Sequence, residues 1–225
     1  MVNCKYCFQN SQSFSNLSSD ELDTLNKEKT FLVAKKGENI IKQNTYISSI
    51  ICINDGILSL IIEGERERNI CVGIAGDGDI LGITDLLSNS TYSYTVVTLK
   101  PSAICLYPAK SFRTILNTNM TFRDKMLENY SDYIKHLHSR LMVFGTKQLH
   151  GRLADIILYL DEKKKSIPDI YNHISRKDLA LMTGTSVENV IRLLKEFDHD
   201  GIIKINGKEI IINKIVLLQK LRKIG

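Results

Sequence analysis

Two charged side chains, Glu188 and Arg192, have the types and the spacing needed to read bases in DNA. They lie four residues apart in a stretch with helical periodicity, so they project from one helix face a turn apart. In the major groove, a glutamate accepts a hydrogen bond from cytosine and an arginine donates two to guanine. The alternative is a surface ion pair, which contributes only about 0.2–0.5 kcal/mol.

The elements that must position this pair are predicted within residues 175–203, as two short helices joined by a tight turn. Apolar side chains recur at helical spacing in the second helix, at Val187, Val190, Ile191, Leu194 and Phe197. Gly184 supplies the positive φ that the turn needs, and Ser186 can cap the second helix. This pattern is a helix-turn-helix, whose second helix enters the major groove.

We therefore predict a DNA-contacting surface on the second helix and at the start of the first. The predicted contacts are Glu188, Arg192, Ser186, Val187, Asn189, Arg176, Lys177 and Lys195. The charge distribution agrees, because residues 151–225 hold 14 Lys+Arg against 10 Asp+Glu, whereas the first 150 residues hold 16 against 15. A local positive excess favours contact with phosphates.

The flanking residues complete a winged helix-turn-helix. Asn206-Gly207 lies between two β-branched runs, at 202–205 and 209–212, and predicts the two-residue turn of a β-hairpin wing. Helices are expected at 150–162 and 214–223. Residues 145–147 break the helical pattern before this domain and are a candidate hinge.

The string from Gly184 to Lys195, GTSVENVIRLLK, resembles the C-terminal domain of the Crp/Fnr family of bacterial transcription regulators. The resemblance implies that Glu188 and Arg192 are the base-reading pair of a regulator that binds palindromic double-stranded DNA and contacts RNA polymerase. The valine at position 187 is similar to the residue of the Fnr branch, whereas the cyclic-AMP branch has arginine at this position. Ile191 departs from the serine usual in the Fnr branch, so the resemblance does not fix the half-site sequence.

The region 30–108 is predicted to be β structure. Short runs of β-branched residues alternate with Gly, Asn and Asp, which indicates a sandwich or barrel. Its turns, at 37–38, 54–56 and 78–82, resemble the cyclic-nucleotide-binding β-roll of the same family. The expected fold is therefore α+β, with a sensor domain at 1–118 (β-roll, or double-stranded β-helix), a dimerisation helix at 119–145 and a winged helix-turn-helix at 146–225.

The dimerisation helix is predicted from a near-heptad series of apolar residues. The series consists of Met126, Tyr130, Tyr133, Leu137, Leu141 and Phe144. Such a seam can pack within its own domain, but its place between a sensor and a DNA-binding domain favours a homodimer. A two-fold dimer would present two recognition helices to one face of a duplex.

The sequence argues against cyclic AMP as the signal. In the nucleotide-binding branch a glutamate holds the ribose and an Arg-Ser pair holds the phosphate; the corresponding positions here are Ile83 and about Ser93-Tyr94. No Arg or Lys occurs between Arg68 and Lys100. A buried phosphate with no balancing cation is very unfavourable.

An iron–sulfur cluster is one candidate signal sensor. Cys4 and Cys7 have the C-x-x-C spacing of cluster ligands, and the resemblance places Cys105 at the family's distal ligand. The third N-terminal cysteine is missing, with Ser13 near its place. The alternatives are that Cys4 and Cys7 are a thiol pair that oxidises and that Cys105, like Cys52 and Cys71, fills a strand.

Haem is a second candidate, because the family that this chain resembles includes haem-based sensors of carbon monoxide and nitric oxide, among them nitrosative-stress regulators. A small organic ligand and no effector at all are further alternatives. A haem ligand would be sought among His136, His138 and His150. His150 lies near the predicted hinge, where ligation could move it.

Other classes of protein fit less well. The region 30–108 contains no His, so it lacks the His and carboxylate cluster of a metal-dependent β-fold enzyme. The N-terminus lacks the apolar segment of a signal peptide, and no run approaches the ~18 apolar residues of a membrane span, which indicates a cytoplasmic protein. Five cysteines argue against a closed disulfide framework. A ligand-binding or scaffold module without gene regulation is the competing function.

Overall fold

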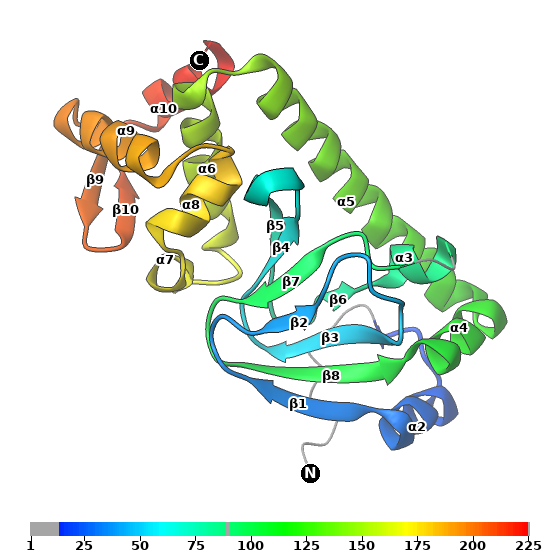
Figure 1. Ribbon diagram of the computed structural model, residues 1–225. Coiled ribbons are helices and arrows are strands. Elements are labelled where there is room, and N and C mark those ends of the chain that lie inside the picture. The colour runs from blue at the N-terminus through cyan, green and yellow to red at the C-terminus, as the bar shows by residue number, and fades with distance from the viewer. Residues whose placement is uncertain (1–13, 89–90, 225) are drawn as a thin grey trace. The chain divides into compact units, whose positions relative to one another are not determined.

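The computed structural model describes residues 14–88 and 91–224, and its contacts divide the chain into two compact units (Figure 1). The first unit holds the chain up to Glu63 together with Gly73–Lys135. The second unit holds Gly64–Val72 and His136–Gly225.

The first unit is built on two four-stranded antiparallel sheets, which confirms the predicted β-roll. One sheet has the order β1-β8-β3-β6 and the other β2-β7-β4-β5. The strands are β1 (Thr30–Ala34), β2 (Asn39–Ile41), β3 (Ser49–Asp55), β4 (Leu58–Ile62), β5 (Ile70–Ala75), β6 (Ile80–Leu81), β7 (Thr95–Thr98) and β8 (Ser102–Pro108). A short 3₁₀ helix, η2 (Glu65–Glu67), lies between β4 and β5.

Strand β3 is apolar on both faces because both faces are covered. Ile50 and Cys52 belong to a core cluster with Phe14, Leu25 and Phe112, which come from the N-terminal segment and two helices. Since successive side chains of a strand point to opposite faces, the residues between them pack on the other side of the sheet. The run SIICIN therefore lacks the alternation of a half-exposed strand.

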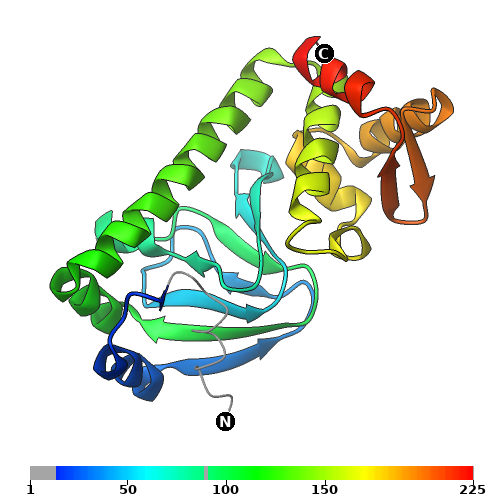
Figure 2. The ribbon, with the colours of Figure 1, turned by 180° about the vertical axis from the view of Figure 1, so that it is seen from behind.

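Three helices flank this core: α2 (Ser19–Glu28), α3 (Ile83–Ser88) and α4 (Ala109–Thr118). Ser18 and Glu21 form a reciprocal capping box at the start of α2. Figures 1 and 2 show α2 and α4 beside the same end of β8.

Helix α5 (Met120–Thr146) runs for 27 residues, as the periodicity predicted, but the predicted seam is partly wrong. Met126 is only 4% exposed and packs in the core cluster of its own unit. Phe144 lies under the guanidinium of Arg140, at 4.7 Å.

The apolar side chains that follow a strict 3,4,3,4 spacing along α5 are Leu127, Tyr130, Ile134, Leu137 and Leu141, here called the α5 seam. Leu127 and Leu141 are 44% and 68% exposed.

The second unit contains the predicted winged helix-turn-helix. Its elements are α6 (Leu149–Lys163), α7 (Ile170–His173), α8 (Arg176–Thr183), α9 (Val187–His199), β9 (Ile203–Asn206), β10 (Glu209–Ile212) and α10 (Ile215–Ile224). The wing differs from the prediction by one residue, because Asn206 is the last residue of β9 and pairs with Glu209. The two turn residues are Gly207 and Lys208, and Gly207 has φ +59°. A glycine at the first position of a two-residue turn is a favoured hairpin geometry.

A buried ion pair joins the end of α5 to the winged helix. Arg140 and Asp155 are 5% and 6% exposed, and their Nη1 and Oδ2 atoms are 3.4 Å apart. Arg140 also donates to the Met182 carbonyl, and Asp155 receives Arg222 Nε at 2.8 Å. The predicted break at 145–147 is wrong for Gly145 and Thr146, which are the last two residues of α5, and the helix ends before Lys147. Arg152 donates to the carbonyls of Phe144 and Lys147 at this helix end.

Among the described helices, none combines the length and the apolar character that crossing a membrane requires.

Candidate nucleic-acid interface

The turn between α8 and α9 follows from its glycine and its two caps. Ser175 and Asp178 form a capping box at the start of α8, which ends at Gly184 with φ +64° in the left-handed region. The Ser186 side chain accepts a hydrogen bond from the Asn189 N–H and begins α9. A Cβ added at Gly184 would lie 2.8 Å from the Phe144 ring, so both backbone conformation and space require glycine there.

Helix α9 has one buried face and one exposed face. Val190, Leu193, Leu194 and Phe197 are each at most 1% exposed and form the buried face. Glu188, Arg192 and Lys195 are exposed on the other side. The helix therefore offers a charged face to a duplex while its apolar face holds it in the domain.

Glu188 is held as an anion at the start of α9. Hydrogen bonds from its own backbone N–H and from Ser186 lower the pKa of the Glu188 carboxyl below its ordinary value. The first turn of a helix also favours negative charge. The carboxylate can therefore accept a hydrogen bond from a base without first losing a proton.

Arg192 has a different ionic partner from the one considered in the sequence. Its Nη1 atom lies 3.5 Å from Oε2 of Glu196, and Oε1 of Glu196 lies 2.9 Å from Nε2 of His150. The Arg192 side chain is 59% exposed, and exposed pairs contribute about 0–1 kcal/mol, so Arg192 can leave Glu196 to contact DNA. The sequence reasoning missed Glu196, although its i,i+4 spacing from Arg192 was visible.

The remaining predicted contacts have varied surroundings. Lys177 is exposed, Val187 is partly buried, and Asn189 donates through Nδ2 to Thr185 Oγ1 at 3.1 Å. Arg176 is partly buried and donates to the Gly207 carbonyl at 3.1 Å, and this burial lowers its pKa. Arg176 is therefore placed to support the wing turn.

The wing carries two lysines that the sequence reasoning left out. Lys204 and Lys208 are exposed on and beside the β9–β10 hairpin, which Figures 1 and 2 show next to α9. Lys208 Nζ donates to the Asn172 carbonyl at 2.9 Å. The sequence feature that could have identified these two residues is the presence of a lysine on each side of the Asn206-Gly207 turn.

The positions compared with a cyclic-nucleotide site, Ile83 and about Ser93-Tyr94, carry uncharged side chains. Tyr94 is buried and its hydroxyl accepts the Gly82 N–H at 3.2 Å. Ser93 donates to the carboxyl of Asp85, which is itself buried. These contacts agree with the argument against a bound phosphate.

Asp85→Asn should stabilise the first unit at neutral pH. Asp85 is 6% exposed, and among the described residues its Oδ2 atom has no hydrogen-bond partner. Burial raises the pKa of Asp85 above its ordinary value of 3.8. The folded state therefore holds this proton more tightly than the unfolded state, and it loses stability as the pH rises from 3.8 through the raised pKa. Urea unfolding of wild type and variant between pH 4 and 7 should show the advantage of asparagine growing with pH. An advantage that does not change with pH would contradict this assignment.

The candidate ligands for iron–sulfur and haem have separate positions. Cys4 and Cys7 lie outside the described residues, and Cys105 is buried in the core cluster of the first unit. His150 contacts Glu196 through Nε2 and its ring lies 6.1 Å from the Phe197 ring, so both contacts lie within the winged helix. The described residues contain no group of three or more His, Cys, Asp or Glu that could hold a metal ion.

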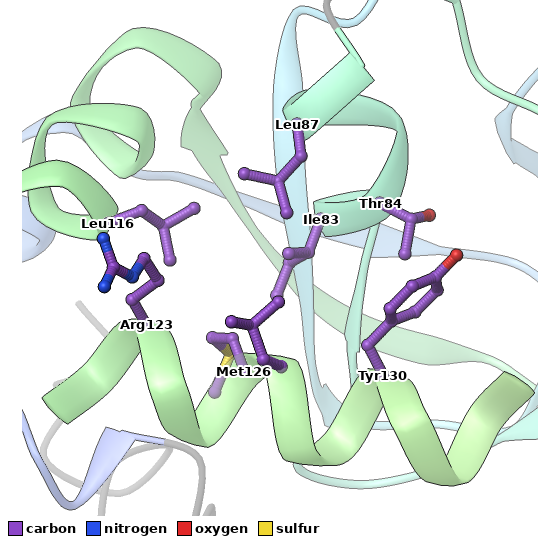
Figure 3. A pocket seen from close by; sticks show the side chains of 8 residues that line it. Ile83, Thr84, Leu87, Leu116, Arg123, Met126 and Tyr130 are labelled. Carbon is purple, nitrogen blue, oxygen red and sulfur yellow. The ribbon is translucent and has the colours of Figure 1, made fainter. Parts of the chain in front are cut away.

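A small groove lies between α3 and α5 (Figure 3). It is lined by Ile83, Thr84, Leu87, Leu116, Arg123, Met126, Leu127 and Tyr130. Its volume of about 10 Å³ is room for about one water molecule. Leu127 and Tyr130 also belong to the α5 seam, so the groove borders the exposed apolar side of that helix.

A β-roll, a long helix and a winged helix-turn-helix together define a DNA-binding regulator with an attached β-roll domain. Residues 31–119 match the model of the cyclic nucleotide-binding domain, and residues 151–221 match that of the Crp-like helix-turn-helix domain. The chain belongs to the Crp/Fnr family of transcription regulators. Members of this family bind DNA, act as dimers and are not enzymes.

Named relatives agree with this assignment. The chain is 25% identical to Electron transport regulator A of Shewanella oneidensis over 197 residues, which are 86% of this chain and 78% of the relative. It is 23% identical to the Fumarate and nitrate reduction regulatory protein of Escherichia coli K12, with the same coverage. The fold is similar to FixK2 from Bradyrhizobium japonicum (TM-score 0.73, 18% identity, 86% and 96% covered) and to a CooA mutant from Carboxydothermus hydrogenoformans (0.74, 17%, 98% and 96%).

Proposed function

We propose that this regulator acts as a homodimer that reads a palindromic DNA site and changes its promoter binding in response to a redox, gas or small-molecule signal. Residues 1–118 are the sensor, 119–145 the dimerisation helix and 146–225 the DNA-binding domain. The protein works in the cytoplasm and contacts RNA polymerase. The observation that carries this proposal is the pair Glu188 and Arg192, exposed on α9 above a fully buried opposite face.

The α5 seam supports the homodimer. Its members repeat with the period of a coiled coil, and two of them, Leu127 and Leu141, are 44% and 68% exposed. Apolar side chains gathered on one exposed helix face indicate a surface that another chain covers. A second α5 related by two-fold symmetry would cover this seam and supply the second recognition helix.

The kind of signal is supported by the relatives. Their names refer to electron transport and to the reduction of fumarate and nitrate, which are redox processes. The sensor of this chain has cysteines in its core cluster, and it has no cation at the positions compared with the cyclic-nucleotide site. Both features favour a redox signal over a phosphate ligand.

Arg192→Ala should relax base preference at one position of the site. A bidentate arginine–guanine contact contributes about 1–3 kcal/mol of discrimination, so affinity should fall for sites with that G·C pair and little for sites without it. The measurement is selection of binding sites from a random duplex library, followed by gel-shift titration. Lys195→Ala is the matched control on the same helix, and it should weaken all sequences alike and reduce the salt dependence. Equal loss on every sequence with Arg192→Ala would contradict base reading.

A further inference from the structure

Two cysteines lie directly opposite each other in the first sheet. Cys52 on β3 and Cys105 on β8 are register partners in the antiparallel pair. The same register places Phe31 of β1 opposite Cys105 and Ile80 of β6 opposite Cys52. The four side chains therefore form one row across the sheet, on one face, with the thiols in the middle.

The spacing of register partners suits a disulfide. Directly opposed residues of antiparallel strands have Cα atoms about 4.5–5.5 Å apart, and a disulfide joins Cα atoms about 4.4–6.8 Å apart. No disulfide joins Cys52 and Cys105 in the structure. Closing the bond would need a small inward movement of the two Cβ atoms and no change of register.

We propose that Cys52 and Cys105 are a reactive dithiol that closes into a cross-strand disulfide when a peroxide oxidises it. One thiolate attacks the O–O bond, which gives a sulfenic acid and releases the first oxygen as water. The second thiolate attacks the sulfenic sulfur, which forms the S–S bond and releases the second water. Two thiols are oxidised, the peroxide is reduced to two waters, and a small thiol can reverse the step by exchange.

Oxidation of the thiols requires local opening of the core. Both cysteines are at most 1% exposed and share one core cluster with Phe14 and Leu17 of the segment before α2. Phe14 rests on Tyr107 and Phe122, with ring centroids 6.0 Å apart in each case. The segment contains one short turn before α2, and such pieces open locally at a lower cost than the whole domain unfolds. Phe14→Ala should therefore speed the oxidation severalfold.

The dithiol shares its core cluster with the start of α5. Phe122 and Met126 of α5 belong to the same cluster as Cys52 and Cys105. Closing the disulfide would shift the packing around Phe14 and Phe122 within the first unit. This coupling rests on the redox signal of the proposed function, whereas the disulfide itself does not.

The test uses the full-length protein and its Cys4→Ser/Cys7→Ser variant, treated with hydrogen peroxide, alkylated with iodoacetamide and mapped by mass spectrometry. The expected result in both is a crosslinked peptide joining Cys52 to Cys105, with loss of two hydrogens. Cys71, on β5 of the other sheet, should stay uncrosslinked and serves as the buried control. A disulfide from Cys105 to Cys4 or Cys7, or no Cys52–Cys105 link under peroxide, would overturn the proposal.

Gel-shift titration of the oxidised protein then separates this inference from the proposed function. If the crosslink changes DNA affinity in wild type and the change is absent in Cys52→Ala, the result supports both the Cys52–Cys105 disulfide and the redox signal of the proposed function. If the crosslink forms and DNA affinity is the same before and after oxidation, the result supports the disulfide and contradicts a redox signal. Cys71→Ala should behave as wild type in either case.

Discussion

Leu141→Asp will separate the proposed dimer and reduce affinity for a palindromic site by about 100-fold or more. In the paired helices, each new carboxylate would be buried in the seam without a partner, which costs about 3–5 kcal/mol when a buried charge is uncompensated. Each 1.4 kcal/mol is about tenfold in an equilibrium constant, and a monomer keeps only half of the DNA contacts. Because Leu141 is 68% exposed in the single chain, the fold itself should change little in stability.

Met142→Asp is the matched control for this variant. Met142 follows Leu141 directly, is 63% exposed and lies outside the α5 seam. Sedimentation equilibrium should show monomers for Leu141→Asp and dimers for Met142→Asp, with DNA affinity lost only in the first. A dimeric Leu141→Asp protein would exclude this seam as the dimer contact.

Asp155→Ala will destabilise the second unit by about 3–5 kcal/mol, because it leaves the buried Arg140 without its carboxylate. Burial already lowers the pKa of Arg140, and Asp155 is the main group that opposes this effect. Urea unfolding followed by circular dichroism, with a separate probe of the winged helix, should show the loss in the second unit.

Arg222→Ala is the comparison variant, because Arg222 contacts the same Asp155 carboxylate. Its side chain is 47% exposed and can return to solvent, so its removal should cost only about 0–1 kcal/mol. The double variant Arg140→Met/Asp155→Leu should recover most of the lost stability, since apolar residues of similar size can replace a buried pair. A double variant as unstable as Asp155→Ala would mean that the loss comes from packing and not from the unpaired charge.

The sequence was sufficient to predict those structural elements that depend on residues close together in the chain. The cap at Ser186, the glycine turn at Gly184 and the helical periodicity of α9 depend on residues within one or two helical turns. The structure confirms these elements. The helices predicted at 150–162 and 214–223 are α6 (Leu149–Lys163) and α10 (Ile215–Ile224).

The features that sequence reasoning missed depend on distant parts of the chain. Met126 was placed in the seam because its spacing fits, but the face of α5 that is buried is decided by Phe112 and Phe122 of the same core cluster. The Arg140–Asp155 pair joins two helices, and the Cys52–Cys105 pair is set by strand register across 53 residues of chain. No spacing rule within either partner's own segment indicates such contacts.

Arg192 meets every duplex with its guanidinium already beside Glu196, which His150 contacts in turn. A duplex without guanine at the matching place gives Arg192 nothing in exchange for that carboxylate. Such a duplex is therefore disfavoured by slightly less than the free energy of the missing hydrogen bonds, because Arg192 keeps its contact with Glu196 there. Residue 196 can thus adjust how sharply the regulator distinguishes its own operators from random genomic sequence, although no base needs to touch it.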